Sequence, residues 1–154
     1  MEKSRYLFRE SVVSAFINAL ISALFFFGVF AGVDPVPVWG SDGYALDFMP
    51  QSFAVALMSA LVPGFLARKA LGAQRFGAVP TPGARRILVR AFAWAFAGLI
   101  AGAGLAAIAL YLSGMEFVAA APAFAIKVAY GALLGAIVTH RSVAGLLPSA
   151  TSSH

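Results

Sequence analysis

The chain contains four long stretches in which apolar residues follow one another without a regularly recurring polar face. They cover residues 11–33, 49–67, 91–113 and 119–139. Each has about the number of residues that an α-helix needs to cross a hydrocarbon core of about 30 Å. The alternation typical of membrane β-strands is missing from them. The pattern therefore predicts an all-α membrane protein, a four-helix bundle of four transmembrane helices forming a single domain over residues 1–154.

Two other interpretations of the apolar stretches fit less well. Helices of a soluble bundle need one polar face toward water, and these stretches have none. The first stretch follows basic residues as a signal peptide does, but its 23 residues exceed the 7–15 of a signal core, and no small-x-small cleavage site precedes Asp34. We therefore expect a retained helix. The composition agrees, with 61% hydrophobic and 11% charged residues, whereas soluble domains carry about 25% charge.

The charged residues predict the orientation. Ten of the 11 Lys and Arg residues lie before the first stretch, between the second and third, or after the fourth: Lys3, Arg5, Arg9, Arg68, Lys69, Arg75, Arg85, Arg86, Arg90 and Arg141. The acidic residues Asp34, Asp42, Asp47 and Glu116 lie in the other connections. The positive-inside rule then places both termini and the middle loop in the cytoplasm. The net charge of +5 therefore indicates membrane lipids as partners, not nucleic acid. The chain is rich in Ala, Gly and Arg, a composition typical of bacteria with GC-rich genomes. We therefore expect the bacterial inner membrane as its location.

The two halves of the chain, residues 1–71 and 82–145, resemble each other. The segment Arg5–Arg9 before the first stretch matches Arg86–Arg90 before the third, and Pro50 matches Pro122. Such short matches also arise by chance. A tandem duplication of a two-helix hairpin would give a parallel repeat, because both copies have one orientation. We then expect a pseudo-two-fold axis along the membrane normal.

Glycines at four-residue spacing occur in the third and fourth stretches, as Gly98 with Gly102 and as Gly131 with Gly135. Small residues at this spacing let helix backbones approach closely in lipid. We expect these faces to serve the packing of the third and fourth helices within the chain. Contact between copies in a homo-oligomer is the alternative.

A stripe of polar residues follows one face of the first predicted helix, with Ser14 and Asn18 near its centre and Ser11 and Ser22 on either side. The second stretch contributes Ser59, and Pro63 four residues later predicts a kink because it cannot donate to the Ser59 carbonyl. Asn18 should face protein, since lipid offers it no hydrogen-bond partner. Structural hydrogen bonds are the favoured role, and the lining of a polar path is the alternative.

Lys127 is the single cation within the apolar stretches. It shares the helix face of Gly131 and Gly135, which places it between helices, with Glu116, Asp47 or a backbone carbonyl as its partner. A structural ion pair or a snorkelling anchor is favoured. Binding of an anion, or a part in ion or proton movement, remains as an alternative.

The sequence does not predict an enzyme. It lacks Cys, and its two His residues, His140 and His154, lie at a membrane edge and in the tail. It has no HExxH, GxSxG or nucleotide-binding glycine motif. We therefore predict no catalytic, metal-binding or cofactor-binding residues. The interiors of the four stretches contain no Asp or Glu, which disfavours a proton-coupled exporter.

Four features resemble uncharacterised bacterial two-helix hairpin domains of unknown function: the basic N-terminal segment, the helix bearing Asn18, the turn from Asp47 to Pro50, and the segment ending Leu61–Arg68. This resemblance implies an inner-membrane protein, and it assigns a role to no residue. The favoured function is a structural or accessory membrane protein, working as a homo-oligomer or with another membrane subunit. The alternative is a small permease or channel lined by Ser14, Asn18, Ser59 and Lys127.

Overall fold

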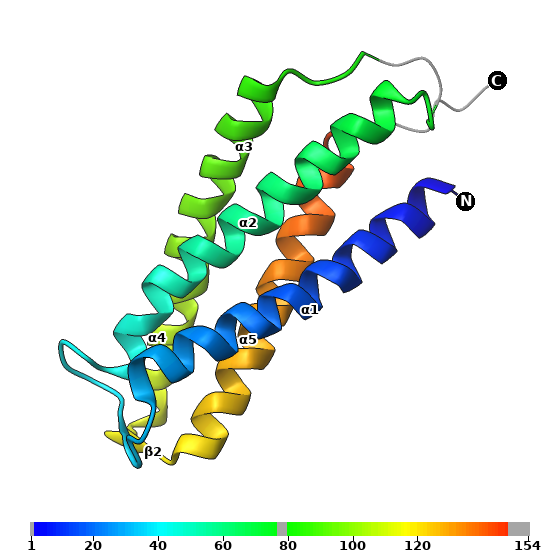
Figure 1. The fold of residues 1–154 in the computed structure, drawn as a ribbon. Coiled ribbons are helices and arrows are strands. Elements are labelled where there is room, and N and C mark those ends of the chain that lie inside the picture. Colours follow the sequence, from blue (N-terminus) through cyan, green and yellow to red (C-terminus); the bar gives the residue numbers. More distant parts are fainter. Residues whose placement is uncertain (1, 77–79, 148–154) are drawn as a thin grey trace.

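The computed structural model describes residues 2–76 and 80–147 and shows a bundle of long helices (Figure 1). Helix α1 spans Glu2–Phe30, α2 spans Tyr44–Gly72, and α5 spans Ala120–Ala144. One further continuous helix lies between α2 and α5 in the chain. It consists of α3 (Ala84–Ala97), the π-helical segment η1 (Gly98–Ala103) and α4 (Gly104–Ser113). Four helices are thus long and apolar enough to cross a membrane. The predicted all-α class is confirmed, and the helices extend beyond the apolar stretches at most of their ends.

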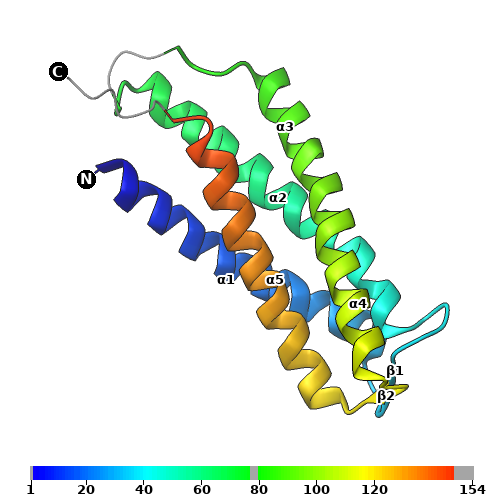
Figure 2. The ribbon, with the colours of Figure 1, turned by 180° about the vertical axis from the view of Figure 1, so that it is seen from behind.

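The two ends of the bundle differ in structure and charge. The start of α1, the end of α2, the start of α3 and the end of α5 lie at one end, which carries the basic residues (Figures 1 and 2). At the other end, strands β1 (Val36–Pro37) and β2 (Phe117–Val118) pair antiparallel, with Val36 opposite Val118. Asp34 accepts a hydrogen bond from the free backbone N–H of Ala120 at 3.0 Å, so the connection between α1 and α2 holds the start of α5.

The helices pair across the two halves of the chain. α1 packs mainly along α5, whereas α2 packs along α3 and η1, and α2 and α5 meet in the centre. The first helix of each half thus rests on the second helix of the other half. This exchange, together with the pairing of β1 with β2, is the arrangement expected from two hairpins related by a two-fold axis.

The same alignment that pairs Arg5 with Arg86 and Pro50 with Pro122 also pairs buried positions. In the first helices it matches Tyr6 with Ile87, Glu10 with Ala91, Ser14 with Ala95 and Ser22 with Ala103, and all eight are buried. In the second helices it matches Gln51 with Ala123, Val55 with Lys127, Ser59 with Gly131, Pro63 with Gly135, Ala67 with Thr139 and Leu71 with Val143, again all buried. The duplication stays a prediction, and this correspondence favours it.

The glycine faces pack within the chain, but mainly on other helices than expected. A Cβ at Gly98 would meet Ala56 of α2, and one at Gly131 or Gly135 would meet Ser22 or Asn18 of α1. Of the four glycines, only Gly102 contacts the fourth membrane helix, through Tyr130. The third and fourth long helices therefore meet at Gly102, and also where Arg90 of α3 donates to the Ser142 carbonyl of α5 at 3.4 Å. The exchanged pairing, which the glycine spacing cannot reveal, is the reason that the other three glycines face other helices.

Candidate functional site

The charged part of the candidate site lies near the starts of α2 and α5, at the end of the bundle where β1 and β2 pair. Lys127 of α5 forms an ion pair with Asp47, whose side chain is 8% exposed, while that of Lys127 is fully buried. Asp47 was expected in the outer connection. The structure corrects this, because α2 begins at Tyr44 and has Asp47 in its first turn, where a carboxylate also suits the helix dipole. One of the four long apolar helices therefore does carry a carboxylate.

Three aromatic rings enclose the Lys127 ammonium. Its Nζ atom lies 5.4 Å from the ring centroid of Phe30, 5.5 Å from that of Tyr44 and 5.3 Å from that of Phe48. Ring faces attract cations, more strongly where water is excluded. The Tyr44 hydroxyl is held by donating to the Ala123 carbonyl at 2.6 Å. The lysine therefore sits in an aromatic cage of Phe30, Tyr44 and Phe48, with Asp47 as its counter-ion.

A hydrogen-bonded cluster occupies the middle of the bundle, where α1, α2 and α5 meet. Asn18 donates to the Ser59 hydroxyl at 2.8 Å and to the Ser14 hydroxyl at 3.0 Å. The hydroxyl oxygens of Ser14 and of Thr139 of α5 lie 2.6 Å apart, within hydrogen-bond distance. All four side chains are buried. The structure thus brings together three of the four predicted candidates, Ser14, Asn18 and Ser59, and adds Thr139.

Thr139 also satisfies the backbone beside Pro63. Its hydroxyl lies 2.9 Å from the Ser59 carbonyl, the acceptor that Pro63 leaves without its usual helical donor. In a membrane, Ser and Thr side chains commonly satisfy carbonyls that proline has freed. α2 remains helical through Pro63. The expected kink stays a prediction, whereas the free carbonyl has a definite partner.

Gln51 and Ser22 connect the two clusters. The Gln51 amide donates to the Ser22 hydroxyl at 2.7 Å and to the Lys127 carbonyl at 3.2 Å. Ser22 follows Asn18 by one turn of α1. The row of buried polar groups therefore runs from Lys127 through Gln51 and Ser22 to Asn18. Gln51 was not singled out from the sequence, although an uncharged amide within a predicted membrane helix is itself a signal.

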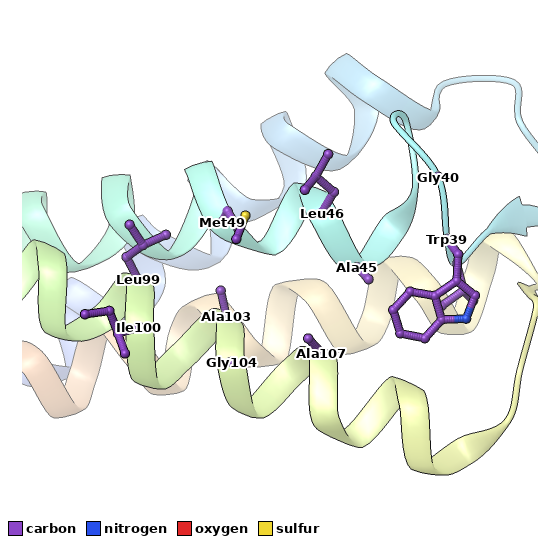
Figure 3. A pocket seen from close by; sticks show the side chains of 11 residues that line it. Trp39, Gly40, Ala45, Leu46, Met49, Leu99, Ile100, Ala103, Gly104 and Ala107 are labelled. Atoms are coloured by element: carbon purple, nitrogen blue, oxygen red, sulfur yellow. The ribbon is translucent and has the colours of Figure 1, made fainter.

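A separate apolar groove lies between α2 and the η1–α4 segment. It encloses about 490 Å³, and its lining includes Trp39, Leu46, Met49, Ile100 and Ala107. Figure 3 shows Trp39 at one end of the groove and the small residues of η1 and α4 along one wall. The π-helical turn beside it was not expected from the sequence, which predicted an uninterrupted helix over 91–113. Such turns are frequent at functional sites.

The described residues contain no group of three or more His, Asp or Glu side chains that could hold a metal ion. Comparison with protein families, with curated proteins and with solved structures found no match to this chain. The proposals that follow therefore rest on the geometry of the bundle.

Proposed function

We propose that the chain is a structural or accessory protein of the bacterial inner membrane, with both termini in the cytoplasm. The observation that supports this is that the buried Lys127 ammonium and most of the buried hydroxyls pair with other groups inside the bundle. Lys127 is neutralised by Asp47, and the hydroxyls of Ser14 and Thr139 bond within the cluster around Asn18. Such contacts fix the register of three helices, which have no hydrophobic drive to associate in lipid.

The apolar groove of Figure 3 supplies the surface for a complex. Small residues, Ala103, Gly104 and Ala107, line the wall that η1 and α4 form. A Cβ added at Gly104 would meet nothing within 4 Å, so this backbone is open to close approach. The transmembrane helix of a second copy or of another subunit fits such a wall, because small residues allow backbone contact.

A small permease is the second candidate, and one observation favours it. The alignment of the halves pairs Lys127 with Val55, Ser14 with Ala95 and Asn18 with Leu99, so the α2–α3 interface packs without these polar groups. The fold therefore does not require a polar row at this place. The row would then serve as the path between α1, α2 and α5.

Flux measurements in proteoliposomes separate the two candidates. Wild type, Asn18→Leu and Lys127→Leu are reconstituted, and uptake of protons, potassium, chloride and glycerol is followed. For a structural protein, we expect background flux in all three samples and a loss of thermal stability in both variants. Wild-type flux above that of empty vesicles, lost in a variant that keeps its helical circular dichroism, would instead establish the permease.

Association through the groove is tested by single-cysteine crosslinking, because the chain has no Cys of its own. Ile100→Cys places a thiol in the groove, and Phe16→Cys places one on an exposed face of α1 as the matched control. We expect a disulfide dimer in native membranes for the first variant only, if the partner is a second copy. Equal crosslinking of both variants would refute specific pairing at the groove.

A further inference from the structure

A second groove runs between α1 and α2 at the basic end of the bundle. It consists of three adjoining hollows of about 180, 300 and 100 Å³. The first two share Tyr6, Arg9 and Arg75. The second and third share Glu10 and Leu66. The groove exists because α1 packs on α5 and has few contacts with α2.

The mouth of this groove gathers positive charge from separate parts of the chain. Arg5 and Arg9 lie one turn apart on α1, and Arg75 comes from the connection after α2. Arg9 pairs with the neighbouring Glu10 at 3.1 Å. Within the part of the chain that the structure describes, no carboxylate pairs with Arg5 or Arg75. Two guanidinium groups are therefore left to meet an anion, for which their planar forks are well suited.

The position of Arg75 is built into the fold. α2 ends in a turn where Gln74 has a φ of 54° and donates its backbone N–H to the Leu71 carbonyl at 2.9 Å. The Arg75 N–H donates to the Ala70 carbonyl at 3.2 Å. Phe76 then packs edge-on against Tyr6, with ring centroids 5.4 Å apart. This contact brings the connection back over α1 and holds Arg75 at the mouth.

Away from the mouth the groove becomes apolar. Val13 and Ile17 of α1 form one wall, and Met58, Val62 and Leu66 of α2, spaced four residues apart, form the other. α1 has 29 residues, or roughly 43 Å at 1.5 Å per residue, which exceeds the hydrocarbon thickness of about 30 Å. Its first turns therefore reach the level of the lipid phosphates, while the apolar part of the groove lies at the level of the acyl chains.

We propose that this groove binds one anionic phospholipid, with its phosphate between Arg5, Arg9 and Arg75 and an acyl chain between α1 and α2. A basic pocket between membrane helices that opens toward the cytoplasmic leaflet is a recognised form of headgroup site. The apolar continuation distinguishes a lipid from free phosphate, because only the lipid fills both parts. This site does not rest on the proposed structural role, and it meets the polar row only at its inner end, where Ser14 and Asn18 also line the hollow.

The headgroup is tested by native mass spectrometry of the detergent-purified chain titrated with phosphatidylglycerol. The variant Arg5→Gln/Arg75→Gln removes the two guanidiniums that pair with no carboxylate among the described residues. Each arginine near the lipid surface contributes about 1 kcal/mol, or roughly a factor of five in Kd. Because the two factors multiply, we expect the Kd of the double variant to rise about thirtyfold. Arg85→Gln/Arg86→Gln makes the same charge change at two exposed arginines outside the groove and should leave the Kd unchanged. An equal loss in both variants would overturn the proposal.

The acyl chain is tested by filling the groove. Val62→Trp should weaken phosphatidylglycerol binding about tenfold, as for the loss of about two methylene contacts. Val89→Trp, on an exposed position of α3, is the control and should have no effect. Phosphatidylcholine with the same chains should bind at least tenfold more weakly than phosphatidylglycerol. Equal binding of the two lipids, or displacement of phosphatidylglycerol by an equal concentration of inorganic phosphate, would refute a lipid site.

Discussion

Removing either member of the Lys127–Asp47 pair should destabilise the bundle, and by different amounts. Asp47→Asn leaves the ammonium of a fully buried side chain with only the three ring faces around it. Loss of one partner of a buried ion pair costs about 3–5 kcal/mol. We therefore expect the free energy of unfolding to fall by an amount near the upper end of this range.

Lys127→Met should cost less. Asp47 also borders a hollow of about 310 Å³ that includes Ser41 and Asp42 of the outer connection, so its carboxylate can gain water when the ammonium is lost. We expect a loss of about 1–3 kcal/mol, the desolvation cost of an imperfectly satisfied polar group. The thioether chain of methionine also keeps most of the volume of the lysine stem.

The double variant Asp47→Asn/Lys127→Met isolates the interaction. It leaves no unpaired charge, so it should be more stable than Asp47→Asn alone, with a coupling energy of at least about 2 kcal/mol. Unfolding is followed by circular dichroism in mixed micelles as the fraction of denaturing detergent rises. Lys69→Met, at an exposed position, makes the same chemical change and should leave the midpoint unaltered. If the double variant loses as much stability as the two single variants added together, the ion pair is refuted.

Two further predictions concern packing and orientation. Gly131→Ala should destabilise the bundle by more than about 2 kcal/mol, because the added Cβ would overlap the Ser22 side chain. Gly104→Ala faces open space and should be neutral or stabilising in the same unfolding assay. Equal effects of the two substitutions would contradict the α1–α5 contact. Alkaline phosphatase fused after Gly40 should be active, and phosphatase fused after Gln74 inactive, since these sites lie at the acidic and basic ends of the bundle respectively; the reverse result would overturn the orientation.

The helices were predictable because the signal that defines them, uninterrupted apolar composition, does not depend on tertiary contacts. The position of Lys127 between helices followed from its shared face with Gly131 and Gly135. The sequence left three possible partners for Lys127, namely Glu116, Asp47 or a backbone carbonyl, because the residue at which α2 begins decides between them. Hydropathy placed that start at residue 49, and the helix begins at Tyr44, which carries Asp47 into the bundle.

Other features could not be reached from local patterns. The aromatic cage draws Phe30 from the end of α1 and Tyr44 and Phe48 from α2, so it depends on which helices pair. The same holds for the bond from Thr139 to the Ser59 carbonyl, 80 residues away in the chain. The π-helical turn at Gly98–Ala103 has no composition that distinguishes it from the rest of an Ala- and Gly-rich helix.

The exchanged pairing of helices has a consequence for synthesis in the cell. α1 and α2 precede α5 in the chain, and Asn18 and Gln51 have hydrogen-bond partners on these two helices. Asp47 gains its counter-ion, Lys127, only when the last helix of the chain is made. A chain that stops before α5 would therefore keep the amide contacts between α1 and α2 but leave the Asp47 carboxylate without its cation.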